Sequence, residues 1–148
     1  MKNAITTPRE FFERVVTPDV AALNSDIDDV RLAFHAAISL HQLSEWVWGA
    51  HPVPFRNAAE YLKSLYPRHL GLEMVRALAF NAKHFPPEWV PTLQTGYSLG
   101  PALSLPNAPS GESTHQQVLA KDELGESIWV VPIILDAYDF WVEELKRS

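Results

Sequence analysis

The stretch "DIDDVRLAFHAAISLHQLSEWVW" (residues 26–48) decides the fold class, because its apolar residues recur at the spacing of an α-helix. At about 100° per residue, the large apolar side chains fall on one face of that helix: Ile27, Val30, Phe34, Ile38 and Trp48. Further apolar side chains widen this face: Ala33, Ala37, Leu40 and Val47. A narrow polar strip lies to one side: Arg31, His35, Ser39 and Gln42. The capping sequence that starts at Ser25 predicts where the helix begins, and Gly49 predicts where it ends.

Two polar residues of this helix, His41 and Glu45, fall within its apolar arc rather than on the polar strip. They are one helical turn apart, so their side chains can reach each other. A buried carboxylate beside an imidazole favours the charged form of the imidazole, which would suit an acid–base pair. The alternatives are a pair that is buried for structural reasons alone, or a pair at an edge where Trp46 and Trp48 meet solvent. A pocket that opens on both side chains would favour an enzyme built on them.

Cap and breaker signals predict further helices on both sides of this stretch. Thr7-Pro8-Arg9-Glu10 has the form of a capping box with a proline in the first turn, and Thr17-Pro18 repeats the start signal. The prolines of "HPVPF" (51–55) separate the long helix from the next one. The predicted helical ranges are 8–16, 17–23, 26–48, 56–66, 67–84 and 132–146.

Between residues 92 and 131 the pattern changes to short strand-like runs separated by turns. The runs "TLQTGYSLG" (92–100), "HQQVLAKD" (115–122) and "SIWVV" (127–131) predict two or three short antiparallel strands. The loop at 101–113 is rich in proline and serine and is long enough to be an arm that binds a partner. The predicted fold class is therefore mainly α, a helical bundle with a β-hairpin inserted before the C-terminal helix. Residues 1–148 are expected to form a single domain.

Composition restricts the kinds of function. Because cysteine is absent, disulfides, thiol nucleophiles and cysteine-ligated zinc are excluded. No apolar run is long enough for a signal peptide or a membrane span, so we expect a cytoplasmic protein without membrane association. Glycine loops that cradle phosphates and the spacings of metal ligands are also missing, so no cofactor or metal is expected.

The charge of the chain is unevenly distributed, although its net value of −6 argues against general nucleic-acid binding. Residues 56–84 carry five basic side chains against two acidic ones, whereas residues 122–148 carry two basic side chains against seven acidic ones. This asymmetry fits a local phosphate-binding face, and it fits equally a homo-oligomer in which opposite patches meet.

The helix predicted at 67–84 has a polar face that includes an aromatic residue. Arg76, Phe80 and His84 lie on this face, with Asn81 and Lys83 beside them. A solvated face is the simplest interpretation, but Phe80 gains nothing in water unless it contacts a partner or another element. Basic side chains are also favoured near the end of a helix by its dipole. The candidate catalytic residues are therefore Arg76, Asn81 and His84, and the candidate binding residues are Lys83, Phe80, His41 and Glu45.

The segment "RALAFNAKHF" (76–85) resembles the motif of the HEPN superfamily, named for higher eukaryotes and prokaryotes nucleotide-binding. Its members are small helical bundles, often dimeric, found in toxin–antitoxin and anti-phage systems. The active members are metal-independent ribonucleases in which four to six residues separate an arginine from a histidine. In this chain seven residues separate Arg76 from His84, so the spacing departs from the family pattern.

This resemblance implies RNA as a partner and a homodimer as the assembly. It also implies a mechanism in which His84 moves a proton, Arg76 stabilises charge on the phosphate and Asn81 orients either group. The rival interpretation is a non-catalytic interaction module that contacts another protein, or a second copy, through its aromatic residues and its hairpin.

Overall fold

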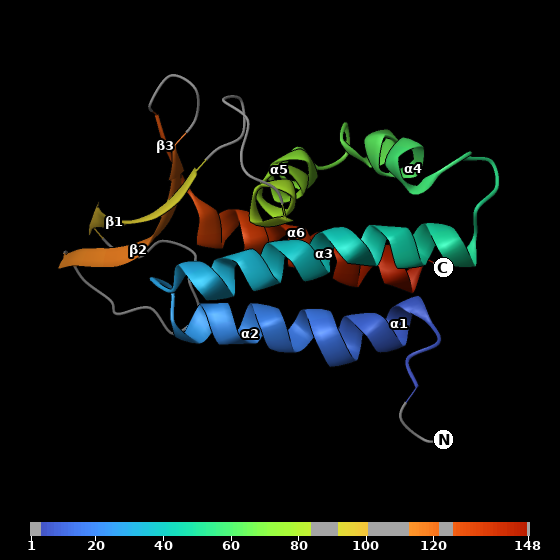
Figure 1. Cartoon of the computed structure of the whole chain (residues 1–148), viewed down its shortest axis with the longest axis horizontal. Helices are drawn as coiled ribbons and strands as arrows, with labels where there is room; N and C mark the ends of the chain where they lie inside the picture. Colours follow the sequence, from blue (N-terminus) through green and yellow to red (C-terminus); the bar gives the residue numbers. More distant parts are fainter. Residues whose placement is uncertain (1–3, 84–91, 101–112, 122–125, 148) are drawn as a thin grey trace.

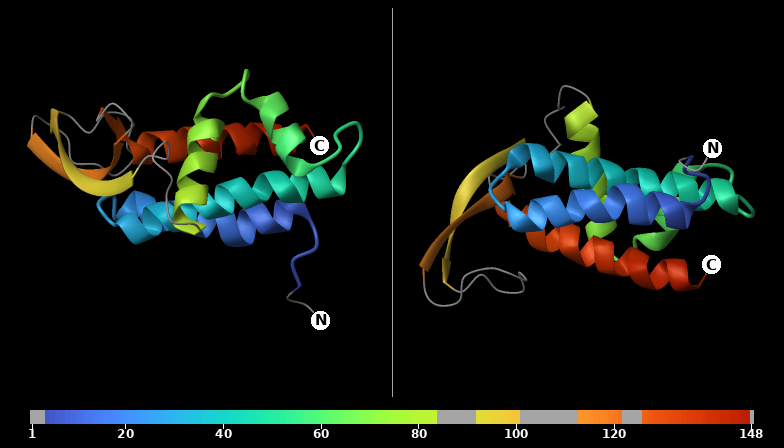
Figure 2. Two further views of the ribbon diagram at one scale, coloured as in Figure 1. Left: turned by 45° about the horizontal axis from the view of Figure 1, so that its top comes forward. Right: turned by 90° about the horizontal axis from the view of Figure 1, so that it is seen from below.

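The computed structural model describes residues 4–83, 92–100, 113–121 and 126–147 (Figure 1). Its long helices lie side by side, and a small antiparallel sheet covers one end of them (Figures 1 and 2). The predicted fold class is confirmed: the chain is mainly helical, with a hairpin placed before the last helix. No helix within the described residues has the length and apolarity that crossing a bilayer requires.

The chain begins with a helical arm made of three consecutive pieces. These are α1 (Pro8–Phe11), the π-helical turn η1 (Phe12–Val16) and α2 (Thr17–Ser25). The predicted cap of α1 is confirmed, because the Thr7 hydroxyl accepts from the Glu10 N–H and the Glu10 carboxylate accepts from the Thr7 N–H, both at 3.1 Å. At the second predicted start, Thr17 caps nothing and instead places its hydroxyl 3.2 Å from that of Tyr138. The helix continues because the Thr17 N–H donates to the Phe12 carbonyl, the five-residue spacing of a π-turn.

The longest helix is α3 (Val30–Ala50), and it starts four residues later than predicted. Asp29 caps it, with its carboxylate accepting from the N–H groups of Arg31 at 2.8 Å and Leu32 at 3.2 Å. The cap predicted at Ser25 is wrong, because Ser25 is the last residue of α2 and Asp26 is the C-cap of that helix. Gly49 does not end α3 either, since the helix continues for one more residue.

The two middle helices are shorter than predicted. α4 (Ala58–Leu65) is capped by Asn57 and buries Leu62 and Leu65, whereas Ala59 is exposed. α5 (Gly71–Lys83) begins four residues after the predicted start, because Arg68 and His69 bond back to the end of α4 in turns. α5 crosses α3 steeply, which both views of Figure 2 show.

The sheet has the order β1-β2-β3 and is antiparallel throughout. Its strands are β1 (Thr92–Gly100), β2 (Ser113–Lys121) and β3 (Ser127–Trp129). A hydrogen bond from the Val118 N–H to the Ile27 carbonyl, 2.8 Å long, ties β2 to the turn between α2 and α3. The final helix, α6 (Val130–Lys146), follows β3 directly and so takes two residues that were predicted to be strand. Pro132 is tolerated because it lies in the first turn, where backbone N–H groups have no partner in the helix.

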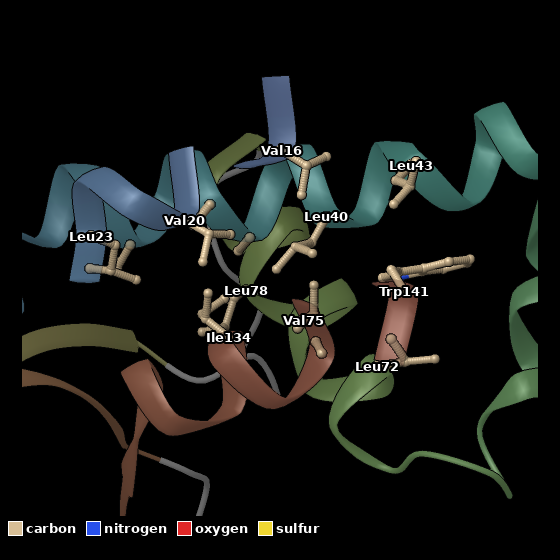
Figure 3. Close-up of a cluster of buried hydrophobic side chains, with 14 of the residues drawn as sticks. Val16, Val20, Leu23, Leu40, Leu43, Leu72, Val75, Leu78, Ile134 and Trp141 are labelled. Carbon is tan, nitrogen blue, oxygen red and sulfur yellow. The ribbon is translucent and has the colours of Figure 1, made fainter. Parts of the chain in front are cut away.

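The core lies between α2, α3, α5 and α6, and Figure 3 shows their side chains pointing into one space. On α3 the buried arc is centred on small side chains, and the large apolar residues predicted to form the buried face are only half-buried. The apolar members of the buried arc are Ala33, Ala36, Ala37, Leu40, Leu43 and Val47. Ser39, expected on the polar strip, is buried and donates to the Ala36 carbonyl at 3.3 Å. The buried arc of α3 is therefore turned about the helix axis relative to the predicted one. A second face of α3, around Ile38 and Glu45, is directed away from the centre of the core.

Candidate functional site

A pocket of about 480 Å³ lies where α5 crosses this second face of α3. We call it the α3–α5 pocket. Its walls are Ile38, His41, Gln42 and Glu45 from α3, and Arg76, Ala79 and Phe80 from α5. Its volume falls within the range of about 300–1,000 Å³ that is usual for sites that bind small molecules.

His41 and Glu45 form the polar part of the α3 wall. The prediction that this pair is buried is wrong, because Glu45 is exposed and His41 is only half-buried. The reason is that α5 covers α3 obliquely and leaves this part of the helix open. The Nδ1 atom of His41 lies below the surface, so the ring is embedded in the pocket wall. Both side chains consequently line the same opening, and neither is sealed in the core.

Arg76 supplies the positive charge of the α5 wall. It is half-buried and lies near Tyr66, where burial raises the pKa of the phenol and the charge of Arg76 opposes that rise. Glu73, an acidic residue three positions before Arg76 on α5, is exposed. None of the ion pairs formed among the described residues involves Arg76. The guanidinium therefore has donors available for a ligand, and its partial burial strengthens their interaction with an anion.

Phe80 lies one turn beyond Arg76 and is half-buried against the pocket. Its position explains why an aromatic residue occurs on the polar side of α5, since at Phe80 this side faces the pocket wall formed by α3. Ala79 and Ile38 continue the apolar wall around it. The pocket thus combines an aromatic ring with a cation, a carboxylate, an imidazole and an amide.

Three of the candidate residues lie wholly or partly outside the described structure. Asn81 and Lys83 belong to the last turn of α5, but their side chains are not described, and His84 is outside the described residues. That Arg76 and His84 act on the same phosphate therefore stays a prediction. The loop at 101–113, proposed as a partner-binding arm, also lies outside the described residues except for its last residue.

In the sequence, Arg76 with Phe80 and His41 with Glu45 form two separate candidate sites, and the structure brings them together in one pocket. Gln42, Ile38 and Ala79 were missed as site residues. The available signal was that each helix breaks its own pattern, because α3 carries His41 and Glu45 within its apolar arc and α5 carries Phe80 on its polar face. Within the described residues, no group of three or more histidine or acidic side chains could hold a metal ion.

Comparisons with known proteins give no family for this chain, because no protein-family model, no curated protein and no solved structure matches it.

Proposed function

We propose that this protein binds single-stranded RNA, with one nucleotide of the strand held in the α3–α5 pocket. The observation that supports this proposal is the convergence of Arg76 and Phe80 of α5 with His41 and Glu45 of α3 on one opening. An exposed base stacks on aromatic rings, and arginine pairs with phosphate oxygens, so one nucleotide uses both groups of the α5 wall. Glu45, on the opposite wall, accepts a hydrogen bond from the 2′-hydroxyl of the adjoining nucleotide of the strand.

We further propose that the bound strand is cleaved without a metal ion, as the HEPN resemblance implies. In this mechanism His41 removes the proton of the 2′-hydroxyl, and the 2′-oxygen attacks the adjacent phosphorus. The bond from phosphorus to the 5′-oxygen breaks, which leaves a 2′,3′-cyclic phosphate, and the 5′-oxygen takes up a proton from His84. Arg76 stabilises the charge that develops on the phosphate.

RNA binding is tested first, by fluorescence anisotropy with a labelled single-stranded RNA of mixed sequence. Arg76→Gln should weaken binding about tenfold or more, because it removes a charged donor that lies partly within the protein. The matched control is Arg14→Gln on η1, which removes the same charge from an exposed position. η1 lies on the opposite side of α3 from α5 (Figure 1). Equal losses in the two variants, or an absence of binding by the unmodified protein, would overturn the proposal.

Cleavage is tested separately, by incubating the same RNA with purified protein in EDTA. We expect products that end in a cyclic phosphate, and we expect them to disappear in both His41→Ala and His84→Ala. If RNA is bound but never cut, the protein is a binding protein and the catalytic part of the proposal is wrong. Sedimentation of the same samples tests the homodimer, and a stable oligomer without RNA affinity would instead favour the protein-interaction module.

A further inference from the structure

A second hollow adjoins the α3–α5 pocket on the surface of α3. Its walls are Thr6, Pro8, Glu45, Trp46, Gly49 and Ala50, and its volume is about 400 Å³. We call it the Trp46 pocket. Glu45 lines both hollows, so the two meet at its side chain. From Ile38 in the first to Gly49 in the second, they extend for about 17 Å along the axis of α3, at 1.5 Å per residue.

We infer that the Trp46 pocket is a second nucleotide subsite, which holds the base next to the one in the α3–α5 pocket. This inference rests on the proposed function and specifies it further, since it makes the ligand a strand of at least two nucleotides. The chemistry of the Trp46 pocket is aromatic and uncharged apart from Glu45. Such a surface favours the stacking of a base, and stacking is tolerant of base identity.

Trp46 is held in place for this role by Phe11 of α1. The two rings are stacked with centroids 5.1 Å apart and an angle of 18° between their planes. Trp46 is half-buried, so part of the indole remains accessible from the hollow. A ring that is fixed in this way loses little conformational freedom when a base stacks on it, which lowers the cost of binding.

Basic side chains lie beyond the Trp46 pocket. A smaller hollow of about 120 Å³ shares Pro8 and Ala50 with it and includes Arg9 and His51. We call the surface formed by these three adjoining hollows the groove. Along it the side chains follow in the order Arg76, Phe80, Glu45, Trp46 and then Arg9 with His51. Arg76 at one end and Arg9 at the other, with aromatic rings between them, match a short strand whose phosphates flank its stacked bases. Arg9 also lies 4.0 Å from the Glu13 carboxylate.

Gly49 provides a direct test, because it lines the Trp46 pocket and leaves it open. A Cβ atom added at Gly49 would meet no atom within 4 Å, so there is open space at this position for a side chain to enter the hollow. Gly49→Leu would fill the hollow, and it would also favour the helix, since glycine is a poor helix former. Gly49→Ala is the control, because it makes the same backbone change and adds only one methyl group.

The experiment measures the affinities of a nucleoside monophosphate and of a dinucleotide that carries the same 5′-phosphate. The unmodified protein and Gly49→Ala should bind the dinucleotide about tenfold more tightly than the monophosphate. Gly49→Leu should lose that gain and retain the affinity for the monophosphate. Thermal unfolding of each variant confirms that the fold is retained.

The outcomes separate the two proposals. If the monophosphate binds and depends on Arg76, but the second nucleotide adds nothing or Gly49→Leu changes nothing, the second subsite is wrong and the first pocket stands. If neither ligand binds, the proposed function fails and the subsite fails with it.

Discussion

Glu45 places a carboxylate in the middle of the groove, where it lines both hollows. A carboxylate repels phosphate, so it is unfavourable in a site that only neutralises a nucleic-acid backbone. It is favourable where a hydroxyl group donates to it, and the 2′-hydroxyl is the group that distinguishes RNA from DNA. Glu45 is therefore the residue that would make the pocket selective for RNA.

We predict that Glu45→Ala abolishes a preference for RNA over DNA of the same sequence. RNA affinity should fall roughly tenfold through loss of a charged hydrogen bond, whereas DNA affinity should stay the same or rise. The measurement is a pair of titrations with matched RNA and DNA oligonucleotides. Glu143→Ala, which removes an exposed carboxylate from α6, serves as the control. Equal strengthening of RNA and DNA binding by Glu45→Ala would mean that the carboxylate only repels the strand.

Tyr61 of α4 gives a second prediction for a single residue. Burial raises the pKa of its phenol to about 12 from a usual value of 10, and the negative charge of Glu144 adds to the rise. The folded protein therefore holds this proton more tightly than the unfolded chain does. Its contribution to stability is complete below pH 10 and is lost as the pH rises towards 12.

Urea denaturation at several pH values tests this titration. The free energy of unfolding should fall with pH between 10 and 12 in the unmodified protein, and it should fall less steeply in Tyr61→Phe. A slope that is unchanged in the variant would show that Tyr61 does not titrate abnormally. Tyr66→Phe is a useful comparison, because burial also raises the pKa of Tyr66.

At the scale of elements, the start of α3 shows how a cap is selected among several candidates. Asp26, Asp28 and Asp29 all lie close to the first turn, and the sequence pattern alone favoured a cap at Ser25. In the folded chain, Asp26 and Asp28 share a hydrogen bond that raises the pKa of Asp26, so these two carboxyl groups interact with each other. Asp29 is the residue whose carboxylate reaches two free N–H groups of the helix.

We predict that Asp29→Ala lowers the free energy of unfolding by about 1 kcal/mol, the usual effect of losing an N-cap. Ser25→Ala should have little effect, because Ser25 is an exposed residue at the end of α2. Chemical denaturation of both variants at neutral pH provides the comparison. A larger loss in Ser25→Ala than in Asp29→Ala would restore the cap that the sequence predicted.

The difference between local and non-local contacts of the helices and strands explains which parts of the fold and the site were predictable. The periodicity of α3 and α6, the Thr7 cap and the strand pattern at 92–100 are local, so the sequence predicts them well. The crossing of α5 over α3 is not local, because it depends on which small side chains of α3 the other helices cover. For that reason both halves of the pocket were recognised as candidate residues, but their convergence was not.

At the scale of the whole molecule, the net charge of −6 limits how RNA can be bound. A protein that covers the backbone with a broad basic surface neutralises many phosphates, and its affinity then depends steeply on salt. The described groove instead offers Arg76 at one end and Arg9 with His51 at the other, and Arg9 is already engaged with the Leu145 carbonyl at 3.1 Å. Binding through this groove must therefore depend mainly on stacking and hydrogen bonds, with only one or two phosphates neutralised.

This limit predicts a weak dependence of RNA affinity on salt. Each neutralised phosphate of a single strand contributes about −0.7 to the slope of log affinity against log salt concentration, so the expected slope lies between about −0.7 and −1.4. Raising the salt from about 50 to 200 mM should then weaken binding only about three- to sevenfold. In Arg76→Gln the slope should become shallower by about 0.7, whereas Arg14→Gln should keep the original slope. A slope several times steeper would mean that the strand lies on a basic surface elsewhere on the molecule, because this groove lacks the cations to produce it.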